Sequence, residues 1–157
     1  MDCKQQECLN RFFVQTFNKI MAAEERALQA SGVTNLSVRE LHIVEAAVLC
    51  GAGEATMSRL AAMLGISVGA LTTAVNTLVR KGYLVRRGRP DDRRIVLVEP
   101  TEAGLTANEQ HERFHEQMIE AVAQQLPQEQ LTTLTASLEA LSEFFENFNK
   151  TGETTCP

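Results

Sequence analysis

The 157-residue chain has no long apolar run and no clustered cysteine pattern. None of its hydrophobic stretches reaches the ~18 uninterrupted apolar residues that a membrane span needs, and the first five residues contain no apolar signal region. These two absences predict a cytoplasmic protein without a membrane partner. The four cysteines form no CxxC pair, which argues against a disulfide framework and against a cysteine zinc site: Cys3, Cys8, Cys50 and Cys156.

Enzyme motifs are also missing. The sequence has no glycine-rich phosphate loop and no nucleophile elbow, and its glutamate and histidine residues have no obvious partner nucleophile. Hydrophobic residues make up 44% of the chain and charged residues 22%, which is enough for a packed core. We therefore expect a folded protein that is not an enzyme.

The charge distribution points to nucleic acid despite a net charge of −5. Between Arg80 and Arg94 lie seven basic residues, opposed only by Asp91 and Asp92, so this short stretch carries +5. A concentrated basic patch on an acidic body is typical of a DNA reader, and a solvated basic loop is the alternative.

The centre of the chain predicts a helix-turn-helix followed by a hairpin. Ser37 opens one helix with a capping box, Thr56 caps a short helix, and Ser67 caps a further helix that ends at Gly82. A turn with Gly65 joins the last two helices. Residues 83–87 and 93–99 read as strands around a Gly-Arg-Pro-Asp-Asp turn, which predicts a wing.

The two ends of the chain predict long amphipathic helices. Apolar residues recur near the 3.6-residue period over 5–30 and in steps of three and four from Leu131 to Phe148. Exchange of these helices between two chains would bury them, which predicts a two-fold homodimer, with an intramolecular helical pack as the alternative. The expected fold is mainly α with a small β-hairpin wing: dimerisation helix 1–34, winged helix-turn-helix domain 35–100, dimerisation helices 101–149 and tail 150–157.

Three stretches resemble the MarR family of transcription regulators: residues 60–67, residues 78–84, and Asp91-Asp92-Arg93-Arg94 through to Gly104. The resemblance implies a DNA-binding regulator, expected to be a repressor, that binds double-stranded DNA as a dimer. Within the family, residues 24–28, 36–42, 69–76 and 111–115 look similar to the fatty-acid-synthesis repressors (FabT-like). That similarity implies a co-repressor with a long acyl chain, carried on acyl carrier protein.

The helix after Ser67 is expected to read DNA. Its side away from Leu71, Val75 and Leu78 presents small and polar groups to base edges in the major groove, and Asn76 would suit adenine. With no arginine on that side, strong guanine reading is not expected. The predicted contacts on this helix are Ser67, Gly69, Thr72, Thr73 and Asn76.

The basic residues are expected to contact phosphates or the minor groove. Arg80, Lys81, Arg86 and Arg87 are the predicted phosphate contacts. The family motif implies that Arg94 enters the minor groove and that Asp92 orients it, with Arg89 or Arg93 as alternatives.

An effector pocket is expected between the terminal helices and the DNA-binding unit. The acyl-chain reading predicts an apolar cleft that needs no cofactor, lined by Phe13, Phe17, Met21, His42, Phe114, His115 and Met118. The zinc-responsive branch of the family uses one glutamate and three histidines, a set that Glu24, His42, His111 and His115 resemble. Histidines held by hydrogen bonds between helices are the ordinary alternative.

A redox-sensing regulator is a further alternative. Cys8 lies where hydroperoxide-sensing members of the family carry their reactive cysteine, but it is not flanked by the basic groups that would activate the thiol.

Overall fold

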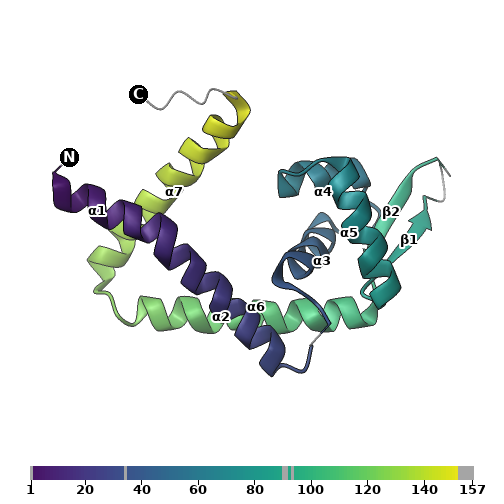
Figure 1. The fold of residues 1–157 in the computed structure, drawn as a ribbon, viewed down its shortest axis with the longest axis horizontal. Helices are drawn as coiled ribbons and strands as arrows, with labels where there is room; N and C mark the ends of the chain where they lie inside the picture. Colours follow the sequence, from purple (N-terminus) through teal and green to yellow (C-terminus); the bar gives the residue numbers. More distant parts are fainter. Residues whose placement is uncertain (1, 34, 90–91, 93, 152–157) are drawn as a thin grey trace. The chain divides into compact units, whose positions relative to one another are not determined.

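The computed structural model describes residues 2–33, 35–89, 92 and 94–151. The elements are α1 (Cys3–Arg11), the π-helical turn η1 (Phe12–Thr16), α2 (Phe17–Ala30), α3 (Val38–Cys50), α4 (Met57–Leu64), α5 (Val68–Lys81), β1 (Leu84–Gly88), β2 (Val96–Pro100), α6 (Glu102–Ala123) and α7 (Gln128–Thr151). This order confirms the expected mainly α fold with a β-hairpin wing (Figure 1). No described helix alone is long and apolar enough to cross a lipid bilayer, although α4 and α5, bent by 107°, meet that test as a pair.

The chain divides into two compact units, Met1–Phe114 and His115–Pro157, and the division falls inside α6. The expected domain limits at residues 34 and 100 do not coincide with it. Helix α2 packs on α3, and its Leu28 belongs to the same buried core as α3, α4 and α5. The N-terminal helices are therefore part of the unit that holds the helix-turn-helix.

Side-chain caps start the central helices where the sequence predicts them. The hydroxyls of Ser37, Thr56 and Ser67 accept hydrogen bonds from the backbone N–H three residues further on. Gly65 and Gly82 end α4 and α5 in the left-handed conformation, which glycine adopts without a Cβ penalty. The predicted helix-turn-helix is thus confirmed, since both of its helices begin and end at the predicted residues.

The core of the first unit lies between α3, α4, α5 and the hairpin. Its largest fully buried side chains, all with an exposed fraction below 2%, are Leu41, Leu60, Leu71, Leu78, Leu84, Val44, Val75 and Val98. Burial of such side chains contributes about 1.5–3 kcal/mol each. The helices and the hairpin that the sequence predicts to contact DNA are therefore held by the core rather than by surface contacts.

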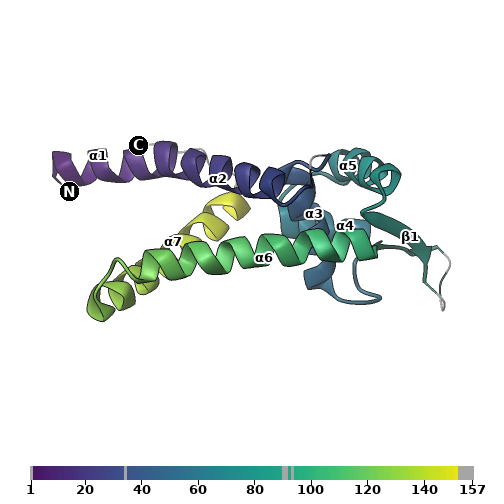
Figure 2. The same ribbon diagram turned by 90° about the horizontal axis from the view of Figure 1, so that it is seen from below.

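The hairpin pairs antiparallel, with Arg86 opposite Val98 and Gly88 opposite Val96. The backbone N–H of Val98 donates to the carbonyl of Ala55 (2.8 Å), which ties β2 to the loop before α4. At the start of α6, a Cβ on Gly104 would collide with the carbonyl of Tyr83, so the helix can approach the end of α5 only with glycine there. In both views the hairpin projects beyond the helices, next to α5 (Figure 1, Figure 2).

Glu40 connects the start of α3 to the end of α5. Its two carboxylate oxygens each lie 2.8 Å from Lys81 Nζ, and the backbone N–H of Ser37 donates to it at 2.9 Å. Burial raises the pKa of Glu40, but the hydrogen bonds from Lys81 and Ser37 and the charge of Lys81 outweigh that effect and hold its pKa below the ordinary value.

We expect Glu40→Gln to reduce the free energy of unfolding at pH 7 by about 1 kcal/mol, because the amide keeps the helix cap and loses the ion pair. A lowered folded-state pKa adds stability above the unfolded pKa of ~4.3, and this stability disappears as the pH falls through the folded pKa. Urea unfolding of both proteins from pH 7 to pH 3 should show the difference shrinking below about pH 4.3. Glu25→Gln, at an exposed position on α2, is the control; a pH-independent difference for Glu40→Gln contradicts the ion-pair role.

Candidate nucleic-acid interface and effector pocket

Helix α5 presents a polar side to solvent. Leu71, Val75 and Leu78 are each 0% exposed, so the helical period turns the opposite side outward. The predicted contacts Gly69, Thr72, Thr73 and Asn76 lie away from this buried side, and Ser67 is the N-cap residue of α5; Thr72 is half-buried and the other four are exposed. A Cβ on Gly69 would meet nothing closer than Ser67 Oγ at 4.0 Å, so packing does not require this glycine.

The hydroxyl protons of this side are partly engaged within the helix. Thr72 Oγ1 donates to the carbonyl of Val68 (2.7 Å) and Thr73 Oγ1 to that of Gly69 (3.4 Å). Each threonine oxygen keeps its acceptor capacity. Toward DNA, these residues therefore offer acceptors and methyl groups rather than donors.

Asn76 is bonded to the wing. Arg86 Nη1 of β1 donates to Asn76 Oδ1 at 2.7 Å, and both side chains are exposed. The predicted base contact and one predicted phosphate contact thus form a single hydrogen-bonded pair.

Three of the other basic residues predicted to contact DNA have acidic partners in the protein. Lys81 binds Glu40, and Arg87 Nε lies 2.9 Å from Glu99 Oε2. Arg89 donates to the carbonyl of Gly53 at 2.8 Å and lies 3.9 Å from Glu54, which ties the base of the wing to the loop before α4. A phosphate would compete with these partners.

Arg94 is exposed near the tip of the wing. Asp92 Oδ1 accepts a hydrogen bond from the backbone N–H of Arg94 at 3.0 Å, so the carboxylate shapes the turn through the backbone. Asp91 and Arg93 lie outside the described residues. Arg80, whose Nη2 donates to the Thr77 hydroxyl at 3.1 Å, is exposed at the end of α5.

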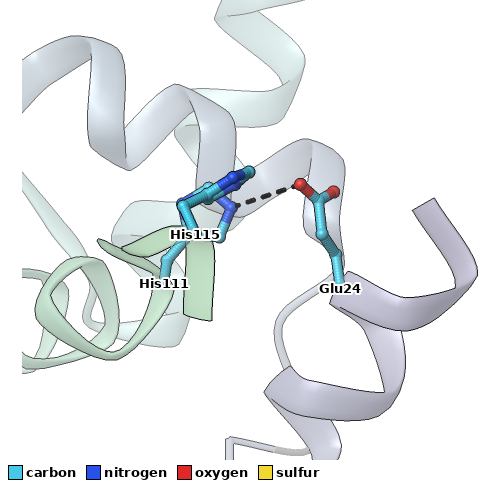
Figure 3. Close-up of side chains that lie close together, drawn as sticks. All are labelled: Glu24, His111 and His115. Carbon is cyan, nitrogen blue, oxygen red and sulfur yellow. Dashed lines mark ion pairs between the residues drawn. The ribbon is translucent and has the colours of Figure 1, made fainter. Parts of the chain in front are cut away.

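The second predicted site centres on Glu24, which is 5% exposed. Its two carboxylate oxygens each lie 3.8 Å from an imidazole Nε2, one of His42 and one of His111. Along the continuous helix α6, His115 follows His111 by one turn, and one ligand atom each of Glu24, His111 and His115 lies within 4.8 Å of the others. Figure 3 shows the carboxylate directed at the two imidazoles of α6. The structure thus brings the predicted glutamate and histidines together.

A small cavity of about 20 Å³ adjoins this cluster. That volume holds about one water molecule or ion. Its wall includes Glu24, His111, Gln110, Leu28 and Phe114. Within the described part of the chain, Gln110 Oε1 is buried without a hydrogen-bond partner, so the cavity offers a further oxygen ligand.

The residues predicted to line an acyl pocket are distributed differently. Phe114 lines the small cavity, and Met21 packs against the core. His42 does not line the cavity, but its Nε2 lies 3.8 Å from Glu24 Oε2. Phe13 and Phe17 are 42% and 62% exposed. Met118 belongs to the second unit, and the acyl cleft stays a prediction.

Sequence reasoning missed Glu45, whose Oε1 lies 3.8 Å from His111 Nδ1. Its position three residues after His42 places it on the same side of α3, and that spacing was the available signal. Glu40 was recognised as a cap but not as the partner of Lys81. Cys8 is exposed on α1, and the redox alternative stays a prediction.

Comparisons with known proteins identify the family to which the chain belongs. A MarR family model matches residues 46–95. The multiple antibiotic resistance protein MarR of Escherichia coli is 34% identical over 69% of this chain and 73% of its own length. The chain belongs to the MarR family.

Two further known proteins are similar to this chain, each over a different part of its length. An uncharacterised HTH-type regulator of Bacillus subtilis, YcgE, is 32% identical over 66% of this chain, and the match spans less than two thirds (64%) of that relative. The crystal structure of Streptococcus pneumoniae FabT in complex with DNA superposes with a TM-score of 0.83 at 29% identity, over 91% of this chain and 99% of that one. The chain is therefore similar to MarR-type transcriptional regulators over about two thirds of its length.

We expect Arg94→Ala to weaken DNA binding at least tenfold while leaving the unfolding free energy unchanged, because the side chain is exposed and lies on the wing. The slope of log affinity against log salt should fall by ~0.9 for each phosphate that the variant no longer neutralises. A mobility-shift titration at several salt concentrations measures both quantities. Undiminished affinity excludes Arg94 from the interface.

Proposed function

We propose that the chain is a homodimeric transcriptional repressor that binds a pseudo-palindromic DNA operator in the cytoplasm. The observation that carries the proposal is the pairing of α5, whose polar side is free of core contacts, with a wing that holds Arg86 and Arg94. A recognition helix in the major groove and a basic wing beside it are the working parts of such a reader.

The terminal helices supply the dimer surface in this proposal. Helix α1 and η1 expose Leu9, Phe12 and Phe13, and α7 exposes apolar residues that include Leu138 and Phe145, all between 42% and 45%. Exposed apolar surface on this scale marks an association site. Because helices at both ends of the chain carry this exposed apolar surface, we propose that a second copy of the chain covers it, as the sequence predicts.

The purified protein should be a dimer at micromolar concentration and protect two half-sites about one helical turn (~10 bp) apart. Light scattering measures the mass, and footprinting on a duplex selected from a random library measures the spacing. Leu138→Glu, on the exposed side of α7, should give a monomer with weaker operator binding, and Glu139→Gln on the same helix is the control. A monomeric wild-type protein that binds one isolated half-site overturns the dimeric repressor.

We further propose zinc as the effector. The residues fit the ion, since a buried carboxylate and neighbouring imidazoles are ordinary zinc ligands. Ligand atoms around a tetrahedral zinc ion are about 3.4 Å apart, and the 3.8 Å and 4.8 Å separations of this cluster need only a small inward movement. Glu24, His42, His111 and His115 would hold the ion, which would cross-link α2, α3 and α6.

An acyl co-repressor is the second candidate. It is supported by the similarity to FabT and by the apolar residues around Phe13 and Phe17. Each buried methylene of an acyl chain contributes ~0.8 kcal/mol, so a chain needs a long apolar cleft. The cavity beside Glu24 is lined in part by charged groups and has room for about one ion, which favours zinc at that position.

We expect zinc at about 100 times its dissociation constant to raise the unfolding free energy by ~2.7 kcal/mol and to change operator affinity. Glu24→Gln should abolish both effects, because it removes the buried carboxylate with little change in volume, while the neighbouring Glu25→Gln should retain them. A parallel titration measures operator affinity with acyl carrier protein that carries a long acyl chain. A response to the acyl partner alone selects the second candidate, and a zinc response that survives Glu24→Gln places the ion elsewhere.

A further inference from the structure

Two residues of the DNA-facing surface are joined by a hydrogen bond that the helix-turn-helix fold does not need. Arg86 Nη1 donates to Asn76 Oδ1 at 2.7 Å, ten residues apart in sequence, and both side chains are exposed. We propose that Asn76 and Arg86 act as one reading unit that selects a guanine in each operator half-site. This inference rests on the proposed operator binding.

The hydrogen bond determines what the pair offers to DNA. A guanidinium group has five N–H donors and no acceptor, so only the amide oxygen of Asn76 can face it. The amide nitrogen of Asn76 must then point away from Arg86. The outward groups of the pair are therefore donors: the Asn76 Nδ2 hydrogens and the remaining N–H groups of Arg86.

A surface of donors discriminates among the four bases. In the major groove, guanine presents two acceptors, N7 and O6, and no donor. Adenine presents N7 beside an N6 amino donor, cytosine presents an amino donor, and thymine presents O4 beside a methyl group. Guanine is the one base whose major-groove edge presents two acceptors and no donor, so it suits this surface of donors better than the other three bases. Adenine, expected from the sequence for Asn76 alone, needs an acceptor opposite its N6 amino group, and in this pair the amide oxygen that would serve is directed at Arg86.

The geometry of the hairpin brings Arg86 to this position. Successive residues of a strand alternate between its faces, so Arg86 shares a face with Leu84, which is 1% exposed and packed in the core with α5. Arg87 lies on the other face and pairs with Glu99 at 2.9 Å. The wing thus directs one of two adjacent arginines at α5, where it supplies the guanidinium that α5 itself lacks in its DNA-facing stretch.

The first experiment compares adjacent arginines. Wild-type protein, Arg86→Ala, Asn76→Ala and Arg87→Ala each select duplexes from a random library, followed by titration of the wild-type operator and its single-base variants. We expect a guanine in each wild-type half-site whose preference over adenine falls about 5- to 150-fold in both Arg86→Ala and Asn76→Ala. Arg87→Ala removes the same charge from the next residue and should keep the preference. The double variant should lose no more than the larger single loss, because the two side chains act as a unit.

The second experiment changes the base instead of the protein. Replacing that guanine by 7-deazaguanine removes N7 and should weaken wild-type binding without affecting Arg86→Ala. Inosine keeps N7 and O6 and should bind as guanine does.

Three results overturn the proposal. One is equal weakening of all duplexes by Arg86→Ala with a smaller salt slope, which shows a phosphate contact only. The second is a required adenine at the position that Asn76→Ala relaxes. The third is selection of no sequence by wild-type protein, which also ends the proposed operator binding, whereas the first two leave it standing.

Discussion

The burial of one side of α5 decides what the other side can do. Leu71, Val75 and Leu78 have no exposed surface, and they pack into the core that α3, α4 and the hairpin share. A rotation of α5 would expose these side chains at a cost of about 1.5–3 kcal/mol each. The polar side with Thr73 and Asn76 is therefore presented in one orientation. The proposed DNA reading depends on that orientation, because base-edge hydrogen bonds tolerate little error in angle or distance.

Helix α3 connects the two candidate sites. Near its start Glu40 holds Lys81 at the end of α5, and within the next five residues His42 and Glu45 lie beside Glu24 and His111. A helix transmits small displacements along its length because its backbone hydrogen bonds keep it rigid. A ligand that draws Glu24 and His42 together therefore acts on the same helix that supports the recognition helix. If α3 has one position with the ligand bound and another without it, the coupling free energy equals the difference between the ligand's binding free energies for these two positions.

Local interactions explain why much of this fold is predictable from sequence. Caps at Ser37, Thr56 and Ser67 involve residues three apart, and the sequence predicts the wing from a Gly-Arg-Pro-Asp-Asp turn between two short strand segments. The π-helical turn η1 and the later start of β2, at Val96 rather than residue 93, leave no periodic signal. The contacts that define the sites join residues ten, 36 and 41 positions apart, namely Asn76 with Arg86, Gly53 with Arg89 and Glu40 with Lys81. No periodicity in the sequence encodes such pairs, although the Glu24 and histidine set was recognisable by residue type.

Several basic residues between Arg80 and Arg94 already have partners within the protein, so their number overstates the charge that can bind DNA. Seven basic residues lie between Arg80 and Arg94. If all of them contacted phosphates in both chains of a dimer, the slope of log affinity against log salt concentration would be roughly −13, at about −0.9 for each phosphate. Lys81, Arg87 and Arg89 direct their donors at Glu40, Glu99 and the Gly53 carbonyl. Arg86 is committed to Asn76, and among the remaining described residues Arg80 and Arg94 extend from exposed positions without an acidic partner. In the proposed function, this division lowers the nonspecific attraction to phosphates, and the proposed Asn76–Arg86 unit directs one guanidinium at a base. This division increases specificity in a protein with a net charge of −5. Specific binding requires a large ratio between the affinity for the operator and the affinity for random DNA, and high affinity for both does not provide it.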